Sequence, residues 1–224
     1  MDHQSLREKL FIDSNQLISI FNQSARPALF LDRDGVIIKD MHYISSPNQV
    51  ELENGFKEFL ESFELCNWPI VVVSNQSGVS RGFFTWDDYD LVTDRLLELL
   101  GYNKSIYAIY ANSEGPKSDI SGFRKPSPKM FTYAASKLNI DLSKSIMIGD
   151  RITDLQAGTA AGLSSVVHVL TGKGKNERFM IKDSLDKEGF FTFLGKRSHF
   201  IPLTNLFDFP LHLLNIVGNG NKDL

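Results

Sequence analysis

Short apolar runs alternate with longer stretches of helical periodicity along most of this chain, and that alternation restricts its fold more than any other feature. The apolar runs predict strands over residues 28–31, 70–73, 106–110, 146–148 and 166–170. The periodic stretches predict helices over residues 55–65, 85–100, 127–138 and 152–161. Strands that alternate with helices are typical of an α/β protein with a doubly wound parallel sheet. Ligands of such sheets bind beyond the carboxyl ends of the strands.

Residues 1–27 and 173–224 flank this pattern, and we expect them to be extensions of a core that spans residues 28–172. The first extension carries apolar residues spaced as in one or two short amphipathic helices. We expect the second to pack on the core, with a strand over residues 190–194, a helix over residues 211–217 and a frayed tail over residues 218–224. Both extensions are candidate surfaces for a protein partner or for self-association.

Composition and charge narrow the class of protein. The 224 residues include 24 Lys and Arg against 27 Asp and Glu, a formal net charge of −3, so no overall basic field attracts nucleic acid. No apolar run reaches the length of about 18 residues that a membrane span requires. Cys66 is the single cysteine, which excludes an intrachain disulfide and suits a reducing compartment. We therefore expect a cytoplasmic protein with neither a nucleic-acid nor a membrane partner.

Polar residues gather directly after the predicted strands. They are Asp32 and Asp34 after the first strand, Ser74 and Asn75 after the second, Lys125 between the third strand and the next helix, and Asp150 with Asp154 after the fourth. Because neighbouring parallel strands end at the same rim of a sheet, we expect these side chains to converge. Crowded carboxylates repel one another unless a cation neutralises them, and hard oxygen ligands favour Mg²⁺.

The chemistry that this set predicts is the transfer of a phosphoryl group. Mg²⁺ and Lys125 would offset the charge of a bound phosphoryl group, and Asp32 would attack its phosphorus to form an aspartyl-phosphate. Asp34 lies two positions on, on the same side of an extended segment, and would protonate the leaving oxygen. Gly35 then allows the chain to turn sharply.

The ordered set of motifs resembles the haloacid dehalogenase (HAD) superfamily of phosphohydrolases over residues 27–172. It consists of residues 32–36 (Asp-Arg-Asp-Gly-Val), Ser74, Lys125, and Gly149-Asp150 with Asp154. The resemblance implies a Rossmann-like core, with Asp32 as nucleophile, Asp34 as general acid and base, and Ser74 and Lys125 as ligands of the phosphoryl group. It also implies a magnesium site made by Asp32, the backbone carbonyl of Asp34, and Asp150. An acidic first turn of a helix explains Asp154 equally well, so we expect it beside the metal ligands rather than among them.

Two further segments limit the resemblance to one branch of the superfamily. Residues 73–82 and 124–128 are similar to the branch that holds the D-glycero-D-manno-heptose 1,7-bisphosphate phosphatases and the histidinol-phosphate phosphatases. The resemblance implies that the substrate contacts Asp40, His42 and Tyr43 in a loop after the first strand, Asn75, Gln76 and Ser77 after the second, and Arg124.

The chain departs from that branch just before Arg124 and Lys125. Members of the branch usually carry a zinc-binding loop of three cysteines and one histidine there, but residues 111–123 contain neither residue type, so we expect no structural zinc. Ser74 follows Asp32 by 42 positions, and Lys125 follows Ser74 by 51. Neither interval has room for an inserted cap domain. We therefore expect an open site, where the substrate, short loops or a partner must exclude water.

These observations predict a magnesium-dependent phosphomonoesterase for a small phosphorylated sugar, with the heptose bisphosphate as first candidate. Histidinol phosphate or another sugar phosphate is the alternative substrate. A phosphotransferase or mutase, a nucleic-acid 3′-phosphatase and a protein-docking module remain as other functions. We expect His168, inside the fifth strand, to be structural, and the basic run of Lys173, Lys175 and Arg178 to be a solvated loop.

Overall fold

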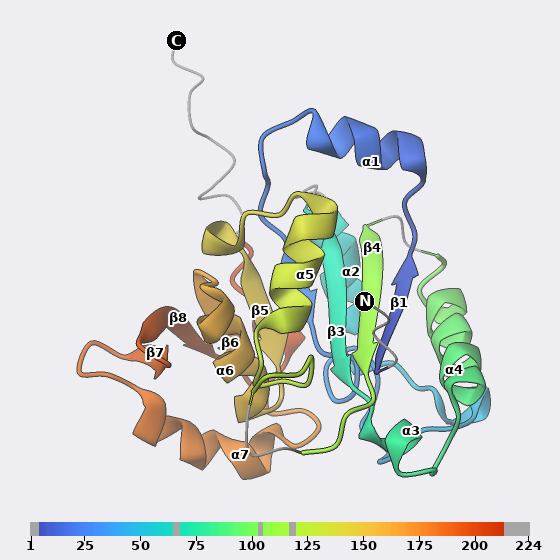
Figure 1. Ribbon diagram of the computed structural model, residues 1–224. Coiled ribbons are helices and arrows are strands. Elements are labelled where there is room, and N and C mark those ends of the chain that lie inside the picture. Colours follow the sequence, from blue (N-terminus) through green and yellow to red (C-terminus); the bar gives the residue numbers. More distant parts are fainter. Residues whose placement is uncertain (1–4, 65–67, 103–104, 117–119, 213–224) are drawn as a thin grey trace.

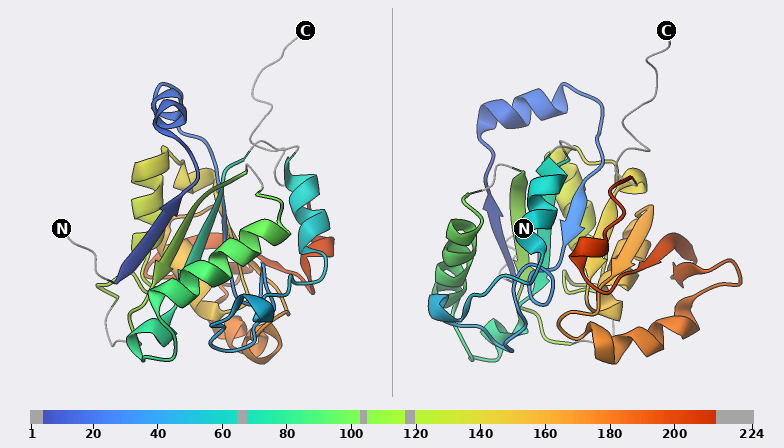
Figure 2. Two further views of the ribbon diagram at one scale, coloured as in Figure 1. Left: turned by 90° about the vertical axis from the view of Figure 1, so that its right-hand side faces the viewer. Right: turned by 180° about the vertical axis from the view of Figure 1, so that it is seen from behind.

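The structure is a computed structural model that describes residues 5–64, 68–102, 105–116 and 120–212. These residues form one sheet with helices on both faces (Figures 1 and 2). The strands are β1 (Leu6–Leu10), β2 (Leu29–Leu31), β3 (Ile70–Asn75), β4 (Ile106–Asn112), β5 (Ile146–Gly149), β6 (Ser165–His168), β7 (Phe190–Phe193) and β8 (Lys196–Pro202). The helices are α1 (Ser14–Phe21), α2 (Phe56–Glu64), α3 (Ser77–Ser80), α4 (Trp86–Leu99), α5 (Lys129–Leu138), α6 (Ile152–Ala161) and α7 (Gly174–Ile181), with short 3₁₀ turns η1 (Pro47–Gln49), η2 (Leu142–Lys144), η3 (Lys182–Ser184) and η4 (Leu206–Asp208). None of the described helices is long and apolar enough to cross a membrane.

The five strands expected from the apolar runs are present as β2–β6, and the predicted α/β fold is confirmed. The strand order is β1-β4-β3-β2-β5-β6-β8-β7. The strands from β4 to β8 in this order are parallel, whereas β1 and β7 pair antiparallel at the two edges. Because β2 lies between β3 and β5, the strand that leads into Asp32 ends where the strand order reverses, which is the usual ligand position in such sheets.

The N-terminal segment differs from the predicted helical extension, because Leu6–Leu10 is a strand. Ion pairs of Arg7 with Asp90 and of Lys9 with Asp94 connect this strand to α4. A helix of five residues would be too short to be stable, whereas the edge of β4 offers partners for the backbone N–H and C=O groups of β1. The rest of the segment does contain a helix, α1, which lies across the upper end of the sheet in Figure 1.

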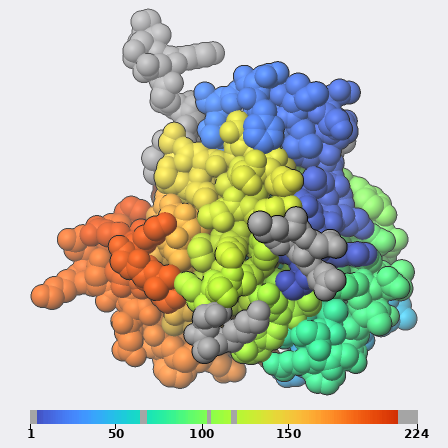
Figure 3. All heavy atoms as spheres, in the orientation of Figure 1, coloured from blue at the N-terminus to red at the C-terminus, as the bar shows by residue number. Residues whose placement is uncertain are grey.

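Apolar side chains on the two faces of the sheet form two separate cores. Leu29 and Leu31 of β2 belong to the core that includes α2 and α4, and Phe30 between them belongs to the core that includes α5 and α6. Figure 3 shows the second face from outside, with α5 in yellow between the C-terminal segment in orange and the N-terminal segment in blue. Both faces of the central parallel strands are therefore buried, which explains why these strands are continuous apolar runs in the sequence.

The segment after residue 172 extends the sheet. β8 pairs parallel to β6, and β7 pairs antiparallel to β8 at the far edge. The predicted strand over residues 190–194 is confirmed as β7, whereas the sequence pattern does not predict β8 and α7. The expected helix over residues 211–217 lies mostly outside the described residues, and the frayed tail over residues 218–224 lies wholly outside them. The division of the chain at residues 27 and 172 stays a prediction, although strands from both flanks join one sheet.

Short elements fill the two intervals in which a cap domain could be inserted. Between β2 and β3 the described residues form η1 and α2, and between β3 and β4 they form α3 and α4. These elements either pack against the sheet or border its carboxyl end (Figure 1). The described part of the chain therefore has no inserted cap domain, as predicted.

Arg178 of α7 connects the C-terminal segment to the sheet. Its guanidinium donates hydrogen bonds to Nδ1 of His168 at 2.8 Å, to the carbonyl of His168 at 2.7 Å and to the carbonyl of Leu203 at 2.8 Å. We expect Arg178→Met to lower the free energy of unfolding by about 2–3 kcal/mol, because three acceptors lose a charged donor. Lys182→Met, at an exposed position nearby, is the control. Chemical denaturation measures both variants, and wild-type stability of Arg178→Met would contradict this role.

Candidate active site

A cavity of about 430 Å³ lies at the carboxyl ends of β2, β3 and β5. All the residues that the sequence predicts for the site line this cavity: Asp32, Asp34, Asp40, His42, Tyr43, Ser74, Asn75, Gln76, Ser77, Arg124, Lys125 and Asp150. Asp154 lines it as well. The fold thus brings the whole predicted set together, and the role of each residue stays a prediction.

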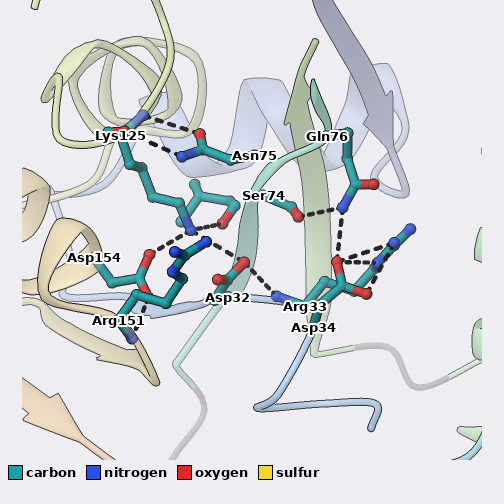
Figure 4. Close-up of polar contacts among 10 residues, drawn as sticks. Asp32, Arg33, Asp34, Ser74, Asn75, Gln76, Lys125, Arg151 and Asp154 are labelled. Carbon is teal, nitrogen blue, oxygen red and sulfur yellow. Dashed lines mark hydrogen bonds and ion pairs between the residues drawn. The ribbon is translucent and has the colours of Figure 1, made fainter. Parts of the chain in front are cut away.

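Lys125 places a buried ammonium among the carboxylates of the site (Figure 4). Its ammonium lies 3.1 Å from a carboxylate oxygen of Asp32 and 2.7 Å from one of Asp154, and it donates to the carbonyl of Val73 at 2.8 Å. Asn75 holds the backbone of Lys125 on both sides, because its side-chain oxygen accepts from the Lys125 N–H at 3.0 Å and its amide donates to the Lys125 carbonyl at 3.1 Å. Asn75 therefore supports Lys125, and its contact with substrate stays a prediction.

Asp34 is oriented by two side chains. Arg33 donates to both of its carboxylate oxygens at 3.0 Å, and Gln76 donates to one of them at 2.8 Å (Figure 4). The same Gln76 amide donates to the hydroxyl of Ser74 at 2.7 Å, which links the ends of β2 and β3. Arg33 is fully buried, with its guanidinium 5.0 Å from the ring centre of Tyr89. Arg33 is a site residue that the sequence pattern does not reveal, since an arginine between two aspartates is also typical of a solvated turn.

Three buried carboxylates form a candidate metal site. One oxygen each of Asp32, Asp150 and Asp154 lies within 4.8 Å of the others. One oxygen of Asp150 accepts the backbone N–H of Lys173 at 2.7 Å. The other is buried and has no hydrogen-bond partner among the described residues. A buried carboxylate oxygen without a donor suits a hard cation, so this group fits Mg²⁺. Asp154 lies within the group, and its place beside the metal ligands stays a prediction.

Burial and mutual repulsion govern the protonation of these groups. Burial raises the pKa of Asp32 to about 7, although the charge of Lys125 lowers it and that of Asp154 raises it again. Burial, reinforced by the charges of Asp154 and Asp32, raises the pKa of Asp150 well above its usual value. Burial alone would lower the pKa of Lys125, but Asp154 and Asp32 raise it, so its ammonium stays charged. The carboxylates outnumber the one ammonium among them, and a divalent cation would offset the remaining negative charge.

Two glycines allow the chain to pass close to Asp150. Gly35 and Gly172 both have positive φ, at 80° and 51°. A Cβ atom on either of them would collide with the same carboxylate oxygen of Asp150. The hydroxyl of Thr171 donates to the carbonyl of Gly35 and joins the two turns. Glycine at these positions thus allows the turn after β2 and the turn before α7 to pass close to the carboxylate of Asp150.

Residues 40–46, here called the 40–46 loop, form one wall of the cavity. The carboxylate of Asp40 accepts the backbone N–H of His42 at 2.9 Å. The hydroxyl of Tyr43 accepts from Arg81 at 2.8 Å, and the ring centres of Tyr43 and Phe83 lie 4.4 Å apart. The three loop residues expected to contact substrate therefore face the cavity in a loop with its own fixed contacts.

Positive charge gathers on another wall. Arg124 donates to the carbonyl of Glu114 at 2.9 Å and lines the cavity together with Arg151, whose backbone N–H donates to Asp154 (Figure 4). Burial lowers the pKa of Arg124, and the charges of Arg151 and Arg81 lower it further. These cations give the cavity a wall suited to a phosphorylated ligand.

His168 holds the backbone of Asp150 by a hydrogen bond. Its Nδ1 accepts from Arg178, so its Nε2 carries the proton and donates to the backbone carbonyl of Asp150 at 2.9 Å. Burial, and then the charge of Arg178, lower the pKa of His168 to about 4, which keeps the ring neutral. The expectation of a structural histidine agrees with this geometry. The expectation that Lys173, Lys175 and Arg178 form a solvated loop is wrong for Arg178, because its guanidinium is hydrogen-bonded to His168 and Leu203.

Lys173 is a cavity residue that the sequence analysis placed in a solvated loop. Its ammonium lies 3.2 Å from a carboxylate oxygen of Asp40 and 3.2 Å from Nδ1 of His42. The sequence does contain a signal for it, since Thr171, Gly172 and Lys173 follow the fifth predicted strand as the other site residues follow theirs.

Comparisons with known proteins agree with this geometry. The model of the HAD-hydrolase-like family matches residues 122–186. A crystal structure of a HAD-like protein from Mesorhizobium loti aligns over 99% of both chains with a TM-score of 0.74 and 27% identity. The D,D-heptose 1,7-bisphosphate phosphatase of B. bronchiseptica, solved with magnesium and phosphate, shares the fold with a TM-score of 0.67 and 24% identity over 85% of this chain and 99% of that one.

Relatives with higher sequence identity narrow the family further. The D-glycero-β-D-manno-heptose-1,7-bisphosphate 7-phosphatase of Mesorhizobium japonicum is 38% identical over 145 residues, which cover 62% of this chain and 67% of the relative. The enzyme of the same name from Escherichia coli K12 is 34% identical over 154 residues, which cover 66% of this chain and 81% of the relative. The chain therefore belongs to the family of HAD phosphatases that contains the D-glycero-β-D-manno-heptose-1,7-bisphosphate 7-phosphatases.

Proposed function

We propose that this HAD phosphatase uses Mg²⁺ to remove a phosphate from D-glycero-β-D-manno-heptose 1,7-bisphosphate, with Asp32 as nucleophile. The observation that carries the proposal is the pairing of buried Lys125 with Asp32 and Asp154 beside the unsatisfied oxygen of Asp150. This arrangement holds a carboxylate nucleophile and a cation next to a candidate metal site in one cavity.

The chemistry follows in two steps from the residues in place. An oxygen of Asp32 attacks phosphorus while the bond from phosphorus to the sugar oxygen breaks, and Asp34 gives that oxygen its proton. Water then attacks the aspartyl-phosphate, Asp34 takes the proton from the water, and inorganic phosphate leaves. Arg33 and Gln76 keep Asp34 oriented for both proton transfers. When bound by Asp32, Asp150 and the Asp34 carbonyl, with Asp154 alongside, Mg²⁺ supplies the positive charge that offsets the phosphoryl oxygens.

The choice of substrate rests on the cavity wall and on the relatives. Charged and polar residues of the 40–46 loop and Arg124 line a space of about 430 Å³, which suits a phosphorylated polyol better than an apolar ligand. The curated relatives carry the name of a heptose bisphosphate 7-phosphatase. Histidinol phosphate and other sugar phosphates are the alternatives, and turnover measured across a panel of these esters decides among them.

Asp32→Asn should abolish phosphate release. The amide keeps the shape of the carboxylate but is a poor nucleophile, so we expect kcat to fall by roughly a thousandfold or more. Phosphate release from the heptose bisphosphate and from p-nitrophenyl phosphate measures the effect, with exposed Asp183→Asn as the control. Wild-type turnover by Asp32→Asn would refute the assignment of the nucleophile.

Mg²⁺ should stabilise the folded protein as well as activate it. We expect a chelator to abolish turnover and added Mg²⁺ to raise the melting temperature, because an ion that binds only the folded state stabilises that state. Asp150→Asn should reduce the rise in melting temperature, whereas Asp183→Asn should keep it. An equal rise in Asp150→Asn and in the wild type would show that the ion binds elsewhere.

The raised pKa of Asp32 predicts a pH dependence of stability without metal. In the unfolded chain Asp32 ionises near its ordinary pKa of 3.8, but in the folded protein it ionises near pH 7. The folded state therefore holds this proton over that interval, and its relative stability falls as the pH rises from about 4 to 7. We expect the fall in free energy of unfolding to be smaller in Asp32→Asn, as measured by denaturation in chelator across this range. Parallel curves for the two proteins would contradict the shift.

A further inference from the structure

Lys173 is in contact with two parts of the site at once. Its backbone N–H donates to Asp150 at 2.7 Å, which directs the other oxygen of that carboxylate toward the candidate metal site. Its ammonium reaches across to Asp40 and His42 of the 40–46 loop, at 3.2 Å from each. Among the described residues, Lys173 alone makes polar contacts both to the carboxylates of the candidate metal site and to this loop. We propose that Lys173 is a positioning residue that holds the 40–46 loop against the metal centre.

The loop depends on such a contact because its own conformation is unfavourable. His42 has a φ of 55°, a left-handed conformation that costs energy for a residue other than glycine. The carboxylate of Asp40 accepts the N–H of His42 and keeps the turn tight. Asp40 is mostly buried, with 16% of its side chain exposed, and the ammonium of Lys173 offsets its charge. Without that ammonium, the loop would retain a mostly buried, unpaired carboxylate in a cavity already lined by other carboxylates.

Lys173 also decides which nitrogen of His42 can donate. A lysine ammonium has three donors and no acceptor, so Nδ1 of His42 accepts in this contact. A neutral ring then carries its proton on Nε2. Lys173 thereby orients the imidazole and leaves one N–H of His42 as a donor for a polar ligand in the cavity.

Arg81 fixes the other end of the loop. It donates to the hydroxyl of Tyr43, while Phe83 packs on the Tyr43 ring. The loop is thus held by Arg81, directly after α3, and by Lys173, directly before α7. The contact made by Lys173 makes the C-terminal segment part of the site, although residues 173–224 were expected to be an extension of the core.

The test replaces the side chain of Lys173 and keeps its backbone N–H. Lys173→Met retains length and the hydrogen bond to Asp150 but removes the charge, Lys173→Arg keeps a cation, and exposed Lys175→Met is the matched control. Hydrogen–deuterium exchange of peptides that cover residues 40–46 needs no substrate. We expect exchange there to be roughly fivefold faster in Lys173→Met, near wild type in Lys173→Arg and unchanged in Lys175→Met, with residues 146–154 unaffected in all three.

Kinetics give the second readout and rest on the proposed function. For the heptose bisphosphate we expect KM to rise roughly fivefold in Lys173→Met with kcat nearly unchanged, because only the loop contacts are weakened. KM for p-nitrophenyl phosphate, which lacks a polyol to reach the loop, should change little.

The outcomes separate this inference from its alternatives. Unchanged exchange of residues 40–46 in Lys173→Met overturns it, and a raised KM in that case assigns Lys173 to direct binding of substrate. Faster exchange in residues 146–154 also overturns it, since the effect would then act through Asp150. Faster exchange confined to the loop with no change in KM for the heptose bisphosphate supports the positioning role and counts against that substrate.

Discussion

The ammonium of Lys125, buried between Asp32 and Asp154, sets the conditions for the rest of the site. A buried ammonium requires paired acceptors, and buried carboxylates require a cation, so each makes the other tolerable in the interior. The charges are not fully balanced, because Asp150 lies in the same group and one of its oxygens has no hydrogen-bond donor. A divalent cation would offset the remaining negative charge of the carboxylates and part of the charge of a bound phosphoryl group. The same excess of buried negative charge therefore governs the pH dependence of stability without metal and the need for a metal in catalysis.

Distant segments of the chain orient these charges. Asn75 at the end of β3 holds the backbone of Lys125, and Arg33 directs Asp34 while stacking on a ring of α4. In the C-terminal segment, the backbone N–H of Lys173 donates to Asp150, and Arg178 donates to His168, which in turn holds the Asp150 carbonyl. Residues after β6 therefore contribute to the candidate site, because Lys173 directly before α7 contacts Asp150 and Arg178 of α7 contacts His168.

The N-terminal segment contacts the end of β4 at Asn112 and Ser113. The carbonyl of Ser5 accepts the backbone N–H of Ser113 at 2.9 Å and the side-chain amide of Asn112 at 3.3 Å. The strand β1 that follows Ser5 is itself held to α4 by two ion pairs. The N-terminal segment thus braces the end of β4, from which the chain runs on toward Arg124.

Local patterns in the sequence were sufficient for the central strands, for the helices that cover them and for the residues at the strand ends, because burial on both faces leaves apolar runs and because parallel strands end at one rim. Local patterns were insufficient for β1 and β8. The apolar spacing of residues 6–10 suits a helix as well as a strand, and residues 196–202 are mostly polar or exposed, so both became strands only because a neighbouring edge offered backbone partners. Lys173 was wrongly placed in a solvated loop, and Arg33 was given no role, for a related reason. The charge of a side chain is visible in the sequence, but whether it is solvated or paired depends on contacts with residues far away along the chain, which only the tertiary structure brings together.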